Sequence, residues 1–193
     1  ANIISNKIKS LSQQKLALYI KKYSNTFSFY ALAPEFDLLK KFTELKTKII
    51  GTDQVLLIAD RLVFSELKEE TKNHKAAEIY SNIENQSVIH FEQFAKGKGS
   101  PYLFTEDFNK NIVKLKALKL STKEQEIIEN IKLSQKIYQT QNHKLRIQLM
   151  KHNLMNNYNT FSNSKNLFKY GAVHMPKGES LLKVFDLENL VNN

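Results

Sequence analysis

Apolar residues recur at helical spacing along most of the chain. Between residues 11 and 23 they form a stripe through Leu16, Ile20 and Tyr23, and Pro34-Glu35 then opens a second helix that reaches residue 45. The same spacing predicts helices over residues 54–70, 74–94, 107–119 and 122–158, the last kinked near Gln141-Asn142. Helix is therefore expected to cover well over half of the chain.

Two short apolar runs end at a glycine and lack the helical period. Residues 46–51 end at Gly51, and residues 166–171 end at Gly171. Such runs are typical of buried strands, and we expect the two to lie side by side. The fold class predicted is α/β and helix-dominated, with a few-stranded, partial sheet and a large helical insertion. Two strands cannot bury both faces of a sheet, so its remaining strands would come from residues outside this chain or from another chain.

Local signals fix several boundaries. Ser121 followed by Glu124 is a capping box and predicts the start of the helix over residues 122–158. Residues 96–101 contain two glycines and a proline and predict a loop. The loop superficially resembles a phosphate-binding loop, but it lacks the required spacing and the preceding strand, so we interpret it as a turn. Residues 156–164 predict a polar loop.

Composition limits the function classes. The 193 residues predict one domain with a sizeable core, and no apolar run approaches the roughly 18 residues of a membrane span. Without cysteine, a metal site would use His, Asp and Glu. The net charge of +10 comes almost entirely from scattered lysines, a pattern that indicates no specific nucleic-acid binding. None of this assigns a compartment.

His174 is the sharpest chemical candidate. It lies three residues after Gly171, at the end of the expected strand, where open α/β sheets place their ligands. A histidine there can titrate near neutral pH, bind a metal or move a proton. The alternative is a histidine that only caps the strand end. The other four histidines lie on predicted helices, where we expect structural or surface roles for them.

A second group of candidate residues forms a stripe on the predicted helix over residues 122–158. Arg146, Met150, Asn153 and Asn157 fall at i, i+4, i+7 and i+11, and so share one helical face. Arg146 is one of only two arginines, Arg61 being the other, which indicates a need for the planar guanidinium. The alternative is an arginine whose stem covers an apolar neighbour.

These segments carry a family resemblance. The order R-x-x-x-M-x-x-N from Arg146, then Lys165, an apolar run and G-A-x-H-M-x-x-G from Gly171 resembles the C-terminal half of the erythromycin-esterase-like proteins. It is also similar to the wider group with the ChaN-type haem-binding proteins and the Tiki/TraB proteases. Residues 46–54 resemble the strand and G-x-D that precede that family's helical insertion, and residues 184–189 resemble its D-x-G-N segment, with Glu188 in place of the glycine.

The resemblance implies roles for individual residues. His174 would be a general base or a metal ligand, Arg146 would hold an anionic or carbonyl group of the substrate, and Asn153 would orient it. Asn157 and Gly171 would join Arg146 and Asn153 in substrate binding. The substrate implied is a small molecule or peptide-like.

The chain also departs from the family pattern. Erythromycin esterases carry H-N-x-H at this strand end, whereas here the first position is Gly171, and no earlier G-x-x-H turn precedes Arg146. We therefore expect residues 1–193 to be the C-terminal part of a larger esterase-like or Tiki-type domain, with half of a site and no efficient hydrolysis alone.

Two other functions remain open. Tyr170, His174 and Met175 are all residue types that can bind haem iron or a metal, so a ChaN-type haem- or metal-binding module without turnover is one alternative. The cofactor would then be haem or a divalent metal. A helical, lysine-rich interaction protein without a small-molecule site is the other.

Overall fold

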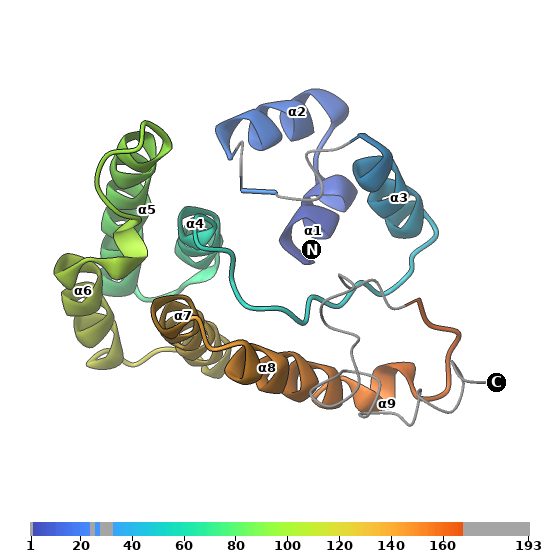
Figure 1. Ribbon diagram of the computed structural model, residues 1–193. Coiled ribbons are helices and arrows are strands. Elements are labelled where there is room, and N and C mark those ends of the chain that lie inside the picture. Colours follow the sequence, from blue (N-terminus) through green and yellow to red (C-terminus); the bar gives the residue numbers. More distant parts are fainter. Residues whose placement is uncertain (1, 24–25, 28–32, 168–193) are drawn as a thin grey trace.

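The computed structural model describes residues 2–23, 26–27 and 33–167, and the regular structure within these ranges is helical throughout (Figure 1). In chain order the elements are α1 (Asn2–Ser10), α2 (Gln13–Lys22), α3 (Ala33–Glu44), α4 (Asp60–Glu70), α5 (His74–Ala95), the 3-10 turn η1 (Tyr102–Phe104), α6 (Glu106–Lys116), α7 (Thr122–Thr140), α8 (His143–Met155) and α9 (Tyr158–Phe161). None of the described helices is both long and apolar enough to cross a membrane.

The prediction of an α/β fold with a partial sheet is wrong, because the part of the chain that the structure describes contains no strand. Residues 47–52 form neither helix nor strand there. Ile49 packs against a core between α1, α2 and α3, whereas Ile50 packs against a core on α8. The two isoleucines, each partly buried, thus contact two different groups of helices without a sheet. Of the second predicted strand, residues 168–171 lie outside the described residues.

The helix predicted over residues 54–70 begins only at Asp60. Upstream of it, the backbone N–H of Val55 donates to Ser134 Oγ at 2.9 Å, and that of Leu57 donates to Tyr138 Oη at 3.2 Å. Because α7 satisfies these groups, residues 54–59 do not need helical hydrogen bonds.

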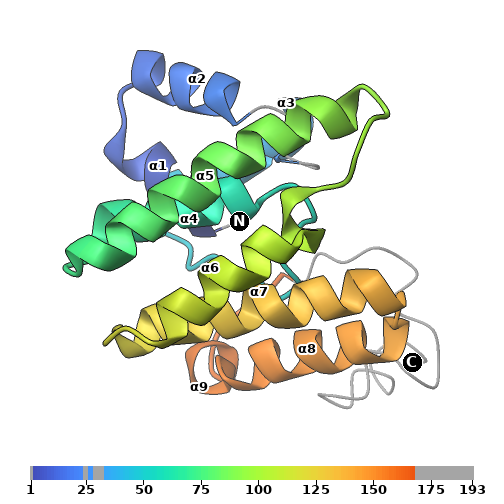
Figure 2. The same ribbon diagram turned by 90° about the vertical axis from the view of Figure 1, so that its left-hand side faces the viewer.

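The long predicted helix of residues 122–158 is divided into two helices, α7 and α8. Ser121 and Glu124 form the predicted capping box at its start. Gln141 ends α7 in the left-handed region at φ 49°, and the Asn142 side chain accepts from Leu145 N at 2.9 Å to begin α8. The chain thus turns back, and α7 and α8 lie side by side (Figure 2). The expected polar loop of residues 156–164 contains α9.

Three groups of buried side chains hold the helices together. The largest joins α4, α5, α6 and α7 and includes Phe64, Tyr80 and Phe108, each fully buried. The second joins α1, α2 and α3 with Leu62 of α4. The third lies on α8 and α9 and includes Met150. These cores hold the 52–57 segment between the first three helices and the α7–α8 pair (Figure 1).

Candidate functional site

Arg146 forms a two-pronged ion pair with Asp53. Its Nε donates to Asp53 Oδ1 at 2.8 Å, and its Nη2 donates to Asp53 Oδ2. The hydrogen bonds to Asp53 raise the pKa of the Arg146 guanidinium above its usual value. A planar guanidinium matches a carboxylate in this way and a lysine cannot, which accounts for an arginine in a lysine-rich chain.

The two asparagines of the predicted stripe add to the contact between α8 and residues 52–53. Asn153 Nδ2 donates to the carbonyl oxygen of Thr52 at 2.8 Å, and Asn157 Nδ2 donates to the carbonyl oxygen of Asn153 at 2.9 Å. Asn157 lies beyond the end of α8, at the N-cap of α9, so it supports Asn153 from the following turn. Met150, the fourth member, is buried in the α8 core. The stripe therefore follows the edge of that core and holds residues 52–53.

Tyr138 and Gln54 border the pair on the α7 side. Burial raises the pKa of the Tyr138 hydroxyl, which accepts the Leu57 backbone N–H. The Gln54 side-chain oxygen is buried and has no hydrogen-bond partner among the residues that the structure describes. A buried amide oxygen without a donor has an unmet hydrogen-bonding requirement.

The other predicted site residues lie outside the described ranges. Gly171 and His174 both do, so the expected approach of Arg146 to His174, and the metal-binding role of His174, stay predictions. Within residues 2–23, 26–27 and 33–167, no three His, Asp or Glu side chains come together as a metal site would require.

The second arginine, Arg61, is a packing residue inside the fold. Its guanidinium carbon lies 4.0 Å from the centre of the Phe91 ring, and its Nη2 donates to Thr26 Oγ1 at 3.1 Å. Its neighbour Asp60 is 2% exposed, and burial raises the pKa of that carboxyl. The two arginines thus do different things: Arg61 is buried at the start of α4, while Arg146 holds a surface segment.

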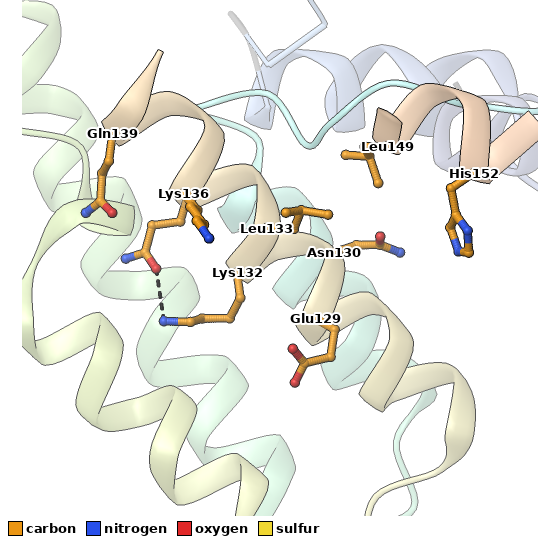
Figure 3. A pocket seen from close by; sticks show the side chains of 9 residues that line it. Glu129, Asn130, Lys132, Leu133, Lys136, Gln139, Leu149 and His152 are labelled. Carbon is orange, nitrogen blue, oxygen red and sulfur yellow. Dashed lines mark hydrogen bonds between the residues drawn. The ribbon is translucent and has the colours of Figure 1, made fainter. Parts of the chain in front are cut away.

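Sequence reasoning missed two features. Asp53 was part of the G-x-D segment, but nothing in the sequence paired it with Arg146 across 93 residues. The second is a groove of about 610 Å³ over α7 and α8 (Figure 3). Its lining residues are Glu129, Asn130, Lys132, Leu133, Gln135, Lys136, Gln139, Leu149 and His152. The available signal was a pair of lysines, Lys132 and Lys136, spaced one helical turn apart.

Comparisons of the chain with family models, with curated proteins and with solved structures give no match.

Proposed function

We propose that this chain is part of a hydrolase-like domain of the erythromycin-esterase or Tiki type, with a half-site that combines His174 with Arg146 and Asn153. One observation carries the proposal: Arg146 and Asn153 both bind residues 52–53. The resemblance drew on residues 46–54 and 146–157 as separate stretches of sequence. Their contact supports the proposal because residues of one site must be neighbours in space.

In this half-site Arg146 binds an anionic or carbonyl group of the substrate. Asp53 occupies two of the five guanidinium N–H donors, so three stay available to a substrate oxygen. Asp53 also fixes the direction of the guanidinium, which is the preorganisation that such a role requires. Asn153, held by Thr52 and Asn157, keeps the α8 wall in place. Gly171 and Asn157 complete the proposed substrate-binding set.

His174 is the general base or metal ligand of the proposed site. A general base needs a group that orients it. Among the described residues, Asp53 supplies the carboxylate that pairs with Arg146. We therefore assign to Asp53 the orientation of His174 as well as of Arg146. This assignment makes the proximity of residue 174 to the Asp53–Arg146 pair the point to test.

The test is a pH titration of His174, monitored by NMR on histidine-labelled protein. Removing the Arg146 charge in Arg146→Met should raise the pKa of His174, because a neighbouring cation disfavours the imidazolium and an unpaired Asp53 favours it. Lys114→Met removes the same charge from the exposed face of α6 and should leave the pKa of His174 unchanged. Equal titration curves in both variants would show that His174 is remote from Arg146 and would overturn the proposal.

Activity and cofactor measurements complete the test. The chain alone should hydrolyse neither macrolides nor simple esters or peptides efficiently, with or without Mn²⁺, Co²⁺ or Zn²⁺, because it carries half of the family's site. Robust turnover that His174→Ala abolishes would show a complete site. A haem absorbance band or bound metal without turnover would instead favour the ChaN-type alternative.

A further inference from the structure

The groove over α7 lies on a different side of this helix from the residues that hold the 52–57 segment. Ser134 and Tyr138 face that segment, whereas Lys132 and Lys136 line the groove. The groove is shallow and open, with a volume of about 610 Å³. It is open to solvent along one side, and Leu149 and His152 of α8 form its far wall (Figure 3).

Lys132 presents an ammonium that only neutral groups hold in place. Its Nζ donates to Asn109 Oδ1 at 3.2 Å and to Gln135 Oε1 at 3.1 Å. Gln135 is itself fixed, because its Nε2 donates to the Leu103 carbonyl oxygen at 2.6 Å and to Asn109 Oδ1 at 3.2 Å. The ammonium is therefore positioned while its charge stays uncompensated. An ammonium has three donors, so one stays available to a ligand.

The rest of the groove adds positive charge. Lys136 lies one turn after Lys132 and forms no ion pair with any described residue. Glu129, the acidic residue of the lining, is paired with Lys116 of α6 at 2.6 Å. Two uncompensated ammonium groups therefore face one groove, and together they favour an anion.

The surface between the charges is apolar. Leu133 of α7 and the buried Leu149 of α8 lie between the lysines and His152. The His152 Nε2 is within 3.0 Å of Asn156 Nδ2, and it accepts that amide's hydrogen when the imidazole is neutral. A ligand that matches this surface has an anionic head for the lysines and an apolar body for Leu133, which is partly exposed above the buried Leu149.

We propose that the groove between α7 and α8 binds a small amphiphilic anion, whose carboxylate or phosphate is held by Lys132 and Lys136 and whose apolar part covers the partly exposed Leu133. This site is independent of the half-site at His174. The shared chemistry of the ligand is a single anionic head on an apolar chain.

A matched series of probes tests each half of the ligand. Octyl phosphate and octanoate carry both parts, octanol carries only the tail, and inorganic phosphate carries only the head. Titration calorimetry should show binding of at least one of the two complete probes, with octanol and inorganic phosphate each bound about tenfold more weakly or not at all. The better of octyl phosphate and octanoate identifies the head. Equal binding of octanol, or no binding of either complete probe, would overturn the proposal.

Variants locate the site. Lys132→Met and Lys136→Met keep the aliphatic stem and remove the charge, and each should weaken the better probe about tenfold. The control Lys114→Met lowers the net charge equally on an exposed part of α6 and should change the affinity less than about twofold. Should Lys132→Met not fold, the exposed Lys136 alone decides the matter. Equal effects of Lys136→Met and Lys114→Met would show that binding is elsewhere.

Discussion

The guanidinium of Arg146 and the carboxylate of Asp53 meet in a two-pronged pair that ties α8 to a segment 93 residues earlier. About a third of each side chain is exposed, 30% for Arg146 and 40% for Asp53. Solvent screening therefore limits what the pair contributes to stability, while its geometry fixes where residues 52–54 lie.

Replacing Arg146 with lysine should separate geometry from charge. Arg146→Lys keeps the cation but loses the fork, and we expect the free energy of unfolding to fall by about 0.5–1 kcal/mol, the upper range for partly exposed pairs. Urea unfolding measures it, and a double-mutant cycle with Asp53→Asn isolates the pairwise part. A coupling free energy of zero would contradict the role assigned to the fork.

Asn153 should matter more than its neighbours on the helix surface. Asn153→Ala removes the donor to the Thr52 carbonyl, and we expect it to lower the unfolding free energy by about 1 kcal/mol. The control Gln148→Ala, on the exposed side of α8, should change it by less than about 0.5 kcal/mol. Equal effects would mean that the Asn153 hydrogen bond adds nothing.

Glu84 should be a centre of acid sensitivity. Burial by itself raises the pKa of this carboxyl, but hydrogen bonds from Lys68 at 2.5 Å and Lys22 at 3.1 Å outweigh it, so the pKa lies below its ordinary value. A depressed folded-state pKa stabilises the fold above the unfolded-state pKa, and this contribution is lost as the pH falls through the folded-state pKa.

Glu84→Gln tests that contribution. The variant should lose about 2 kcal/mol of unfolding free energy at pH 7, the range for hydrogen bonds to a charged group. The loss should shrink as the pH falls below about 4, where the carboxyl of the unfolded chain is protonated. Unfolding curves of both proteins at several pH values measure this difference in free energy. A difference that does not change with pH would contradict a stabilising role of the Glu84 carboxylate charge.

Asp60 should show the opposite sign. Burial raises the pKa of its carboxyl, and Oδ2 has no hydrogen-bond partner among the described residues. A raised folded-state pKa favours the protonated form in the fold. The resulting stability is complete below the unfolded-state pKa and declines as the pH rises through the folded-state pKa.

Asp60→Asn removes this titration while keeping the shape. Relative to the wild type, the variant should gain stability as the pH rises from about 4 to 7. Over this range the Asp60 carboxyl ionises readily in the unfolded chain but unfavourably in the fold, which destabilises the wild type, whereas asparagine does not titrate. Thermal unfolding at matched pH values measures the difference. If instead the stability of the wild type rose relative to that of the variant over this pH range, the fold would stabilise Asp60 as a carboxylate.

The successes of sequence reasoning came from local signals. The capping box at Ser121 and Glu124 correctly placed the start of α7, and the helix predicted over residues 74–94 is α5, one residue longer. Both depend on contacts within one turn or on periodicity along one helix, which a single sequence displays.

The failures involved partners distant in sequence. Ser134 and Tyr138 accept the backbone N–H groups of Val55 and Leu57, so the predicted helix at residue 54 starts six residues late. Ile49 and Ile50 alternate between two cores, a pattern that also predicts a strand. For the site, the shared face of Arg146 and Asn153 could be predicted, but Asp53 as their common neighbour could not.

The contact between Asp53 and Arg146 also brings together the two ends of the chain segment that lies between them. The residues between them form a closed loop of chain, and the side chains of its main core all come from residues 55–138. A stretch whose two ends meet can lengthen or shorten without moving what lies at its neck. Insertions or deletions in the loops between α4 and α7 should therefore leave the pair at the base in place as long as α4 keeps its contact with α1–α3 and α7 keeps its hydrogen bonds to residues 55 and 57.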